Sequence, residues 1–474
     1  MGPFGLLELC SEIGGRRLKK IGKRAKAAYI LVIVFCLGLG FFYVTWGMNG
    51  GNWSLSPYNK HIYSNGSLQN TGVILDRDGE VLAETVDNKR QYNENLTVRR
   101  SLLHLIGDNT SFLGGSIQQS YAAALAGYSP INGVHMLSEW NMVPEMTLTV
   151  SAALNKTVAE AFGSSRKGAV IAYNYRTGEI VCMLSAPNYD PENKPEKLEG
   201  DRYEGVYVNR ALNGMYPPGS TFKIVTATAA IDNIPDIMSR KFTCTGKLET
   251  ADGGEIICNS KHGELDFKRG FAVSCNVVFA QLAMELGSET MKSTAEKYGF
   301  NKNESIGNIG YSGGLYNTTG ASVTDLGWSG IGQYTNLASP YTMMMLSGTI
   351  AMGGNSTPAK VIGTIKNSFG IPTNFGLSLG KNVISSGTAE TLKGMMKSAA
   401  EYTFGTSTVN QYSLRCKTGT AEVDDGQPHA WLTGFLEDAA APYAFAIVLE
   451  NAGSAASATR SVALALIKGL QDIK

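Results

Sequence analysis

Three short strings follow one another along this chain, and together they constrain its fold more than any other feature. They are Pro217-Pro218-Gly219-Ser220-Thr221-Phe222-Lys223, Ser274-Cys275-Asn276 and Lys417-Thr418-Gly419-Thr420. Each string alone occurs by chance in many proteins of this length. Their local contexts predict a helix start, a tight turn and a strand. A fold that uses all three must bring these elements together around one cleft.

The first string predicts a serine nucleophile with a lysine base. The Pro-Pro-Gly sequence opens a helix, so Ser220 lies near a helix N-terminus, where free N–H groups favour negative charge. Lys223 lies three residues further, on the same helical face. It can take the serine proton only if burial, or a second cation such as Lys417, lowers its pKa. For this string alone, an ordinary helix start with a surface lysine is the simpler alternative.

The second string predicts a turn between two helical segments. Such a turn directs Ser274 and Asn276 into the same cleft. There Ser274 can relay a proton towards a leaving amine, and the Asn276 amide can hold a peptide group. A serine that only caps a helix is the alternative.

The third string lies in a predicted strand over 414–421, followed by a second strand over 429–435. Gly419 has no side chain, so a substrate can run close alongside as an added strand. Lys417, Thr418 and Thr420 can bind a carboxylate. The alternative is an edge strand with a solvated lysine.

An uncharged apolar run over 27–48 follows a cluster of Lys and Arg between 16 and 26. About 22 residues at a rise of 1.5 Å cover the hydrocarbon core of a bilayer. The basic flank predicts a cytoplasmic tail over 1–26, a single-pass anchor over 27–48 and an extracytoplasmic remainder. A cleaved signal peptide is a weaker alternative, because no small-x-small pattern follows the run.

The rest of the chain divides into two parts by its patterns. Residues 49–150 hold short β-like pieces, a possible helix over 98–106 and no catalytic string, which predicts a small β-rich pedestal or interaction domain. The alternative makes them the first part of one large domain. Residues 151–474 begin with a helix and a hairpin over 168–184, and end with strands and a helix. With a mostly helical middle, they predict an α+β domain with one antiparallel sheet.

Composition narrows the function classes. The net charge is +1 and charged residues make up 17%, which indicates no nucleic-acid partner. Five His and no Cys-x-x-Cys pair indicate neither a zinc ribbon nor another metal site, and no cofactor is expected. Cys244 and Cys258 flank an Asp-Gly-Gly turn and form either a disulfide or two buried thiols. Cys275 and Cys416 are interpreted as packing residues rather than nucleophiles.

Residues 150–474 resemble the transpeptidase domain of class B penicillin-binding proteins, which build the bacterial cell wall. Besides the three strings, the resemblance includes Lys-Thr-Gly-Thr-Ala-Glu from 417, His-Ala-Trp-x-x-Gly-Phe from 429 and Gly-Ile-Gly-Gln from 330. It implies an α+β fold of the penicillin-binding and serine β-lactamase type, with an antiparallel sheet flanked by helices and an all-helical region. The stretch 72–85 and the anchor are similar to the N-terminal part of the same class.

The resemblance also implies a role for each site residue. Ser220 attacks the D-Ala–D-Ala bond of a stem peptide and forms an acyl-enzyme, which β-lactams would trap, while Lys223 takes the serine proton. Ser274 and Lys417 deliver that proton to the departing D-alanine, and Asn276 orients the donor. Lys417, Thr418 and Thr420 bind the substrate carboxylate beside Gly419. The backbone N–H groups of Ser220 and Thr420 form the oxyanion hole.

A class B enzyme has no polymerase of its own, so the resemblance implies a membrane glycosyltransferase of the SEDS family as partner. The process served, whether elongation, division or sporulation, and the acceptor amine stay open. A serine β-lactamase or D,D-carboxypeptidase on the same fold, which would hydrolyse the acyl-enzyme with an activated water, is the main alternative. A non-catalytic β-lactam sensor is a further alternative.

Overall fold

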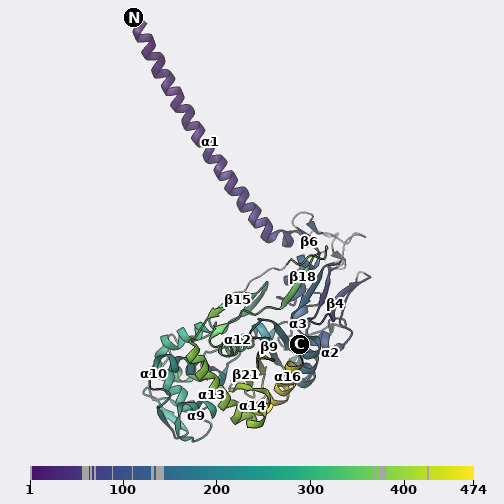
Figure 1. The fold of residues 1–474 in the computed structure, drawn as a ribbon, viewed down its shortest axis with the longest axis vertical. Helices are drawn as coiled ribbons and strands as arrows, with labels where there is room; N and C mark the ends of the chain where they lie inside the picture. The colour runs from purple at the N-terminus through teal and green to yellow at the C-terminus, as the bar shows by residue number, and fades with distance from the viewer. Residues whose placement is uncertain are drawn as a thin grey trace.

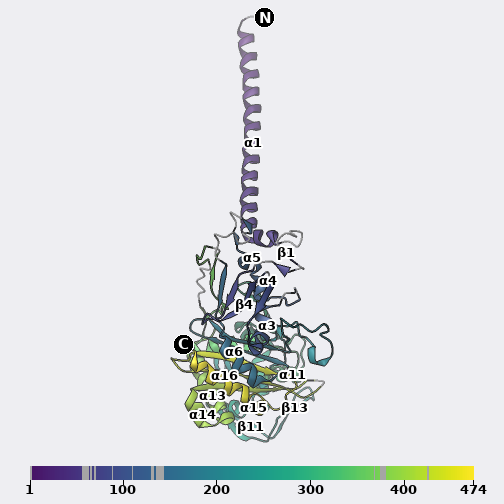
Figure 2. The same cartoon turned by 90° about the vertical axis from the view of Figure 1, so that its right-hand side faces the viewer.

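The computed structural model describes residues 3–55, 63–64, 67–68, 71–87, 89–108, 110, 112–129, 133–134, 143–367, 369–373, 380–423 and 426–473. A single long helix, α1 (Pro3–Ser54), extends away from a globular body (Figures 1 and 2). Its part Lys20–Gly51 is long and apolar enough to cross a membrane, and its apolar side chains are exposed. The predicted run over 27–48 lies inside this span, which is compatible with a single-pass membrane anchor.

A five-stranded sheet lies between α1 and the rest of the body, in the order β18-β8-β3-β4-β5. Its strands are β3 (Val73–Leu75), β4 (Val81–Val86), β5 (Lys89–Tyr92), β8 (Glu145–Leu148) and β18 (Ile362–Lys366). Strand β8 pairs in parallel with β3 and antiparallel with β18. The region over 49–150 therefore shares its sheet with a strand from far along the chain.

Short helices and hairpins surround this first sheet. The predicted helix over 98–106 is present as α2 (Leu96–Ser101) and α3 (Leu103–Ile106), interrupted at Leu102. The other short elements are α4 (Ile117–Ser120), α5 (Ala122–Leu125) and the two-stranded pairs β1 (Tyr63–Ser64) with β2 (Ser67–Leu68) and β6 (Tyr128–Ser129) with β7 (Gly133–Val134).

The second sheet is antiparallel throughout, in the order β10-β9-β22-β21-β20. Its strands are β9 (Gly168–Asn174), β10 (Ile180–Ala186), β20 (Leu414–Ala421), β21 (His429–Leu436) and β22 (Tyr443–Leu449), so the predicted hairpin and C-terminal strands are confirmed. Successive side chains face opposite sides of the sheet. Val170 and Ala172 pack into a cluster with α6 (Ala152–Phe162) and α16 (Arg460–Asp472), whereas Ile171 and Tyr173 join the main core with α12 (Pro340–Ala351).

The middle of the chain is largely helical, as predicted. The long helix α10 (Asn276–Lys297), kinked at Gly287, packs against α8 (Lys223–Asn233) and α11 (Val323–Gly330). Small hairpins lie beside these helices: β11 (Lys241–Cys244) with β14 (Gly263–Asp266), β12 (Lys247–Glu249) with β13 (Glu255–Ile257), and β15 (Asn303–Ile306) with β16 (Ile309–Ser312). The remaining elements are η2 (Asp201–Tyr203), α7 (Arg210–Asn213), α9 (Phe267–Ala272), α13 (Ser386–Phe404), α14 (Thr406–Tyr412), α15 (Ala455–Ala458) and β17 (Asn355–Ser356) with β19 (Lys381–Asn382).

Candidate active site

Ser220 lies in a tight 3-10 turn, η3 (Gly219–Phe222), and the α-helix α8 begins at Lys223. The predicted helix start is therefore one turn later than Ser220. Two contacts hold the turn: the Trp431 indole N–H donates to the Pro217 carbonyl at 2.9 Å, and the Gly219 N–H donates to the Gly332 carbonyl at 2.9 Å. This turn presents the Ser220 hydroxyl at the junction of the sheet and the helical region.

Gly419 also has a packing role that the sequence analysis did not predict. A Cβ atom at this position would lie 2.8 Å from the Pro218 carbonyl oxygen and 2.9 Å from the Thr221 nitrogen. The missing side chain therefore makes room for the Ser220 turn. Strand β20 is an edge strand of the second sheet, so its outer edge pairs with no other strand among the described residues.

Lys223 is fully buried, and its Nζ contacts three of the predicted site residues. Nζ lies 3.0 Å from Ser220 Oγ and 2.7 Å from Asn276 Oδ1, and it lies 3.2 Å from the Oγ and 2.6 Å from the backbone carbonyl of Ser274. Burial, helped by the positive charge of Lys417, holds the pKa of Lys223 well below its usual range. A neutral lysine at this position can accept the Ser220 proton. The alternative of a surface lysine is excluded.

Ser274 occupies a strained turn between α9 and α10. Its φ of 60° is in the left-handed region, which non-glycine residues adopt infrequently. The turn is closed by the Ser274 N–H donating to the Phe271 carbonyl at 3.1 Å and the Cys275 N–H donating to the Gly270 carbonyl at 2.8 Å. Helix α10 begins at Asn276, with Cys275 at its N-cap. Ser274 is therefore not a helix cap, and its hydroxyl and carbonyl both face Lys223.

Lys417 completes a continuous series of polar contacts. It is 1% exposed, and its Nζ donates to Ser274 Oγ at 2.9 Å and to the Thr418 carbonyl at 3.0 Å. Burial lowers its pKa to about 7. Ser274 Oγ thus lies between the two lysine nitrogens, which gives an unbroken path from Ser220 Oγ through Lys223 and Ser274 to Lys417. The alternative of a solvated lysine on an edge strand is excluded.

These residues open into a cleft of about 180 Å³. Its lining includes Ser220, Ser274, Asn276, Thr418 and Thr420 from the three strings. It also includes residues to which the sequence analysis assigned no role: Asn259, Trp328, Ile331, Glu422, Ser454, Ala455 and Ala456. Ile331 and Glu422 lie within the quoted Gly-Ile-Gly-Gln and Lys-Thr-Gly-Thr-Ala-Glu segments, whereas the other five belong to no quoted motif and reach the cleft only through the fold.

A further group of side chains lies directly behind the Ser274 turn. Cys244, Cys258, His262 and Cys275 place their thiol sulfurs and a ring nitrogen within 4.8 Å of one another. Cys244 and Cys258 are free thiols, so of the two alternatives for this pair the structure has the unbonded one.

Comparison with known proteins identifies the fold and the family. The model of the penicillin binding protein transpeptidase domain matches residues 168–468. Penicillin-binding protein A of Mycobacterium tuberculosis, solved as a ceftriaxone acyl-enzyme complex, superimposes with a TM-score of 0.75 at 21% identity, over 85% of this chain and 98% of that chain. PBP2 of Pseudomonas aeruginosa in complex with WCK 5153 gives a TM-score of 0.69 at 20% identity, over 85% and 96%. These likenesses show the fold.

Among curated relatives, the peptidoglycan D,D-transpeptidase PbpA of M. tuberculosis H37Rv is 28% identical over 321 residues. The match covers 62% of this chain and 64% of that protein, which is less than two thirds of the relative's length. The peptidoglycan D,D-transpeptidase FtsI of Escherichia coli K12 is 25% identical over 272 residues, 56% of this chain and 42% of that protein. The family match covers more than half of the chain, and the three strings meet in one site. The chain therefore belongs to the penicillin-binding protein transpeptidase domain family, as a class B penicillin-binding protein.

Proposed function

We propose that this protein is a peptidoglycan D,D-transpeptidase that crosslinks stem peptides through an acyl-enzyme on Ser220 and is acylated by β-lactams. The observation that carries the proposal is the position of Lys223 Nζ, 3.0 Å from Ser220 Oγ and in contact with Ser274 and Asn276. The relatives named peptidoglycan D,D-transpeptidases and the neighbour solved as a ceftriaxone acyl-enzyme complex support the same reaction class.

In the acylation step, Ser220 Oγ attacks the carbonyl carbon of the penultimate D-alanine while its proton moves to neutral Lys223. The backbone N–H groups of Ser220 and Thr420 stabilise the oxyanion, and one such donor is worth roughly 3–4 kcal/mol in comparable sites. The C–N bond then breaks, and the proton reaches the departing amine through Ser274, whose Oγ contacts both lysines.

Deacylation reverses the proton path. An amine from a second stem attacks the acyl carbon, loses a proton to the lysine–serine pair, and the new amide bond releases Ser220 with its hydroxyl restored. Asn276 accepts from Lys223 through Oδ1, and its Nδ2 donates to the Ile257 carbonyl at 2.9 Å, so its amide orientation is set from both ends. We assign it the orientation of the donor peptide, and we assign Thr418, Thr420 and Lys417 the binding of the terminal carboxylate.

The long apolar helix α1 supports a membrane location. The basic residues between 16 and 26 favour a cytoplasmic tail over 1–26, with the anchor over 27–48 and the catalytic domain outside the membrane, where stem peptides are found. Residues 49–150, next to the end of α1, would form the pedestal, and 151–474 would form the transpeptidase domain. A membrane glycosyltransferase of the SEDS family would contact the anchor and the pedestal.

The activity is tested by incubating the detergent-solubilised chain with a pentapeptide stem and an amine acceptor. We expect release of D-alanine together with a crosslinked product, and we expect Ser220→Ala to form neither. Release of D-alanine with only hydrolysed product would instead identify a carboxypeptidase. Rapid catalytic turnover of penicillin would identify a β-lactamase, and either result would contradict the proposal.

A further inference from the structure

Four potential metal ligands converge behind the Ser274 turn from separate parts of the chain. Cys244 ends β11, Cys258 follows β13, His262 precedes β14, and Cys275 is the N-cap residue of α10. Their donor atoms all lie within 4.8 Å of one another. Two small hairpins and a helix terminus thus direct three thiols and one imidazole to a single point.

Three of the six separations between the donor atoms match those expected around a tetrahedral zinc ion. Zn–S bonds of about 2.3 Å and a Zn–N bond of about 2.0 Å place two sulfurs about 3.8 Å apart, and a sulfur and a nitrogen about 3.5 Å apart. The Cys258 and Cys275 sulfurs are 3.8 Å apart. His262 Nδ1 lies 3.5 Å from the Cys258 sulfur and 3.6 Å from the Cys244 sulfur.

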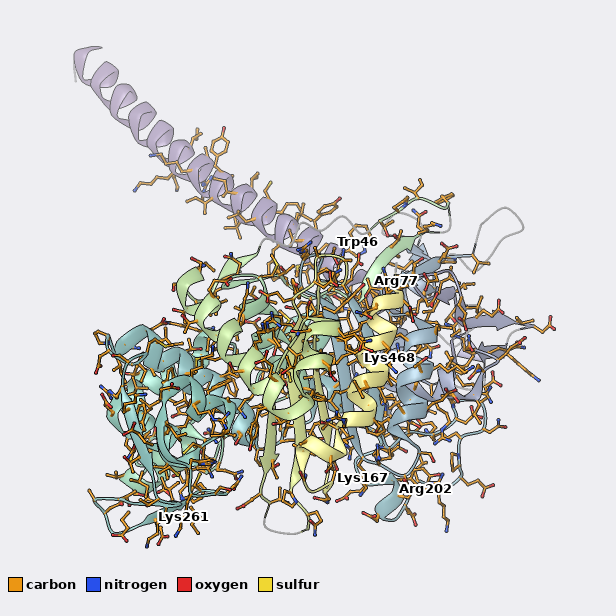
Figure 3. The ribbon with its side chains drawn as sticks, turned by 60° about the horizontal axis from the view of Figure 1, so that its bottom comes forward. Trp46, Arg77, Lys167, Arg202, Lys261 and Lys468 are labelled. Carbon is orange, nitrogen blue, oxygen red and sulfur yellow. The ribbon has the colours of Figure 1, made fainter. Side chains whose placement is uncertain are left out.

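The surroundings also suit a thiolate site. Cys244 and Cys275 are at most 1% exposed, Cys258 is 7% exposed, and His262 is half-buried. The Asn276 N–H donates to the Cys258 sulfur at 3.3 Å, as backbone N–H groups do around metal-bound thiolates. Lys261 precedes His262. In Figure 3 it lies at the outer surface of the largely helical middle part of the chain, far from Trp46 on helix α1. The three thiols are thus buried, whereas the partly exposed His262 lies next to the exposed Lys261.

We propose that Cys244, Cys258, His262 and Cys275 bind a structural zinc ion that holds the catalytic Ser274-Cys275-Asn276 turn in place. Three thiolates and one imidazole fill the four positions that structural zinc requires and leave none for water, so the ion takes no part in acyl transfer. Binding releases the thiol protons to solvent as the sulfurs become thiolates, and no oxidant or reductant is needed.

The connection to catalysis runs through adjacent residues. Cys275 is flanked by Ser274 and Asn276, both of which contact Lys223 Nζ. Asn276 is also hydrogen-bonded to the segment that carries Cys258. Its Nδ2 donates to the Ile257 carbonyl, and its backbone N–H donates to the Cys258 sulfur. The metal would therefore fix a turn whose Ser274 backbone is strained. This effect on acylation rests on the proposed function, whereas metal binding itself does not.

The direct test is the metal content of the full-length chain in detergent, purified without chelator and equilibrated with Zn²⁺ before gel filtration. We expect about one zinc ion per chain, with an X-ray absorption first shell of three sulfurs near 2.3 Å and one nitrogen near 2.0 Å. Retention of less than about one-tenth of an ion per chain would overturn the proposal, as would a disulfide between Cys244 and Cys258 in a non-reducing peptide map.

Matched variants separate ligation from folding. We expect His262→Ala to weaken zinc retention by about 10-fold or more, while His262→Cys, which keeps a fourth donor, retains the ion. Cys36→Ser removes an exposed thiol on α1, away from the site, and serves as the control that keeps full zinc. Equal zinc retention in wild type and His262→Ala would refute the ligand assignment.

The effect on the turn has its own readout. Chelation should increase amide hydrogen exchange in a peptide over 270–280 and slow penicillin acylation of Ser220, and added Zn²⁺ should reverse both. Unchanged exchange on removal of a bound ion would show that the ion does not hold the turn. If the chain binds zinc but crosslinks no stem peptide, the proposed function fails and the zinc site stands.

Discussion

At the scale of single residues, the most informative feature of the site is its two buried lysines, Lys223 and Lys417. An ammonium group loses its hydration when it is buried, so burial lowers the pKa of both Lys223 and Lys417. The charge of Lys417 lowers the pKa of Lys223 further. A lysine that is neutral near physiological pH can act as a base, which an exposed lysine cannot do.

The acylation rate should therefore depend on pH through Lys223. As pH falls through the pKa of Lys223, the lysine takes up a proton, can no longer accept one from Ser220, and acylation slows. Lys417→Met removes the neighbouring positive charge, so the pKa of Lys223 rises and this acidic limb moves to higher pH. Stopped-flow penicillin acylation across pH measures the shift, with the exposed Lys381→Met as control. If acylation by Lys417→Met slowed at the same pH as in the wild type, the charge of Lys417 would not affect the pKa of Lys223.

Replacing Lys223, the proposed base, should slow acylation strongly without unfolding the protein. Lys223→Met keeps a side chain of similar length in a fully buried position and removes a group that is costly to bury. We expect acylation to slow by about 10²–10⁴-fold, the usual contribution of a general base. The melting temperature should stay the same or rise. Near-normal acylation in a folded Lys223→Met protein would assign the base to another group.

At the scale of elements, the site depends on close contact between the η3 turn and β20. Two glycines allow this contact. A Cβ at Gly219 would lie 2.7 Å from the Thr420 carbonyl oxygen, and one at Gly419 would lie 2.8 Å from the Pro218 carbonyl oxygen. The turn and the strand therefore fit together only because both positions lack side chains.

Gly419→Ala should separate the turn from the strand. We expect a loss of stability of about 1–3 kcal/mol, as for other overpacked sites, and acylation slower by about 10-fold or more because the nucleophile shifts by a fraction of an ångström. Gly394→Ala is the matched control. Gly394 lies on helix α13, and a Cβ there would meet nothing within 4 Å. That control should be neutral or more stable by about 0.5–1 kcal/mol. Wild-type acylation by Gly419→Ala would contradict the fit described here.

The local patterns explain which elements the sequence could predict. The apolar runs over 168–173 and 180–184 predict a hairpin because the two strands are adjacent in sequence, and the three strings predict their own local structures. Strand β18 was not predicted, because β8, its partner strand among the described residues, lies more than two hundred residues earlier. The Cys244 cluster was not predicted for the same physical reason: its members have no Cys-x-x-Cys spacing and meet only after the hairpins fold.

At the scale of the whole molecule, the region over 49–150 and the region over 151–474 share a β-sheet and a hydrophobic core. Strand β18 hydrogen-bonds to β8 in the first sheet. Buried Ile74, Leu82 and Met146 from the first sheet belong to the same hydrophobic cluster as Ile171 of the second. A continuous core of this kind transmits strain between its parts, because protein interiors are closely packed. We infer that the two regions fold together.

A fragment over 151–474 should therefore be much less stable than one over 56–474. Removing β8 leaves β18 without its partner strand and exposes the apolar side chains that faced Met146 and Leu148. Burial of each large apolar side chain is worth about 1.5–3 kcal/mol, so we expect a loss of several kcal/mol. Circular dichroism melting and binding of a hydrophobic dye compare the two fragments. Equal melting temperatures would show that residues 151–474 form an independent domain.

We infer that Ser220, activated by Lys223, is the nucleophile. Peptide mapping by mass spectrometry of the full-length protein after penicillin treatment tests it most directly. We predict one covalent penicilloyl adduct, on the peptide that contains Ser220, and no adduct in a folded Ser220→Ala protein. An adduct on any other residue, or continued acylation of Ser220→Ala, would contradict the account.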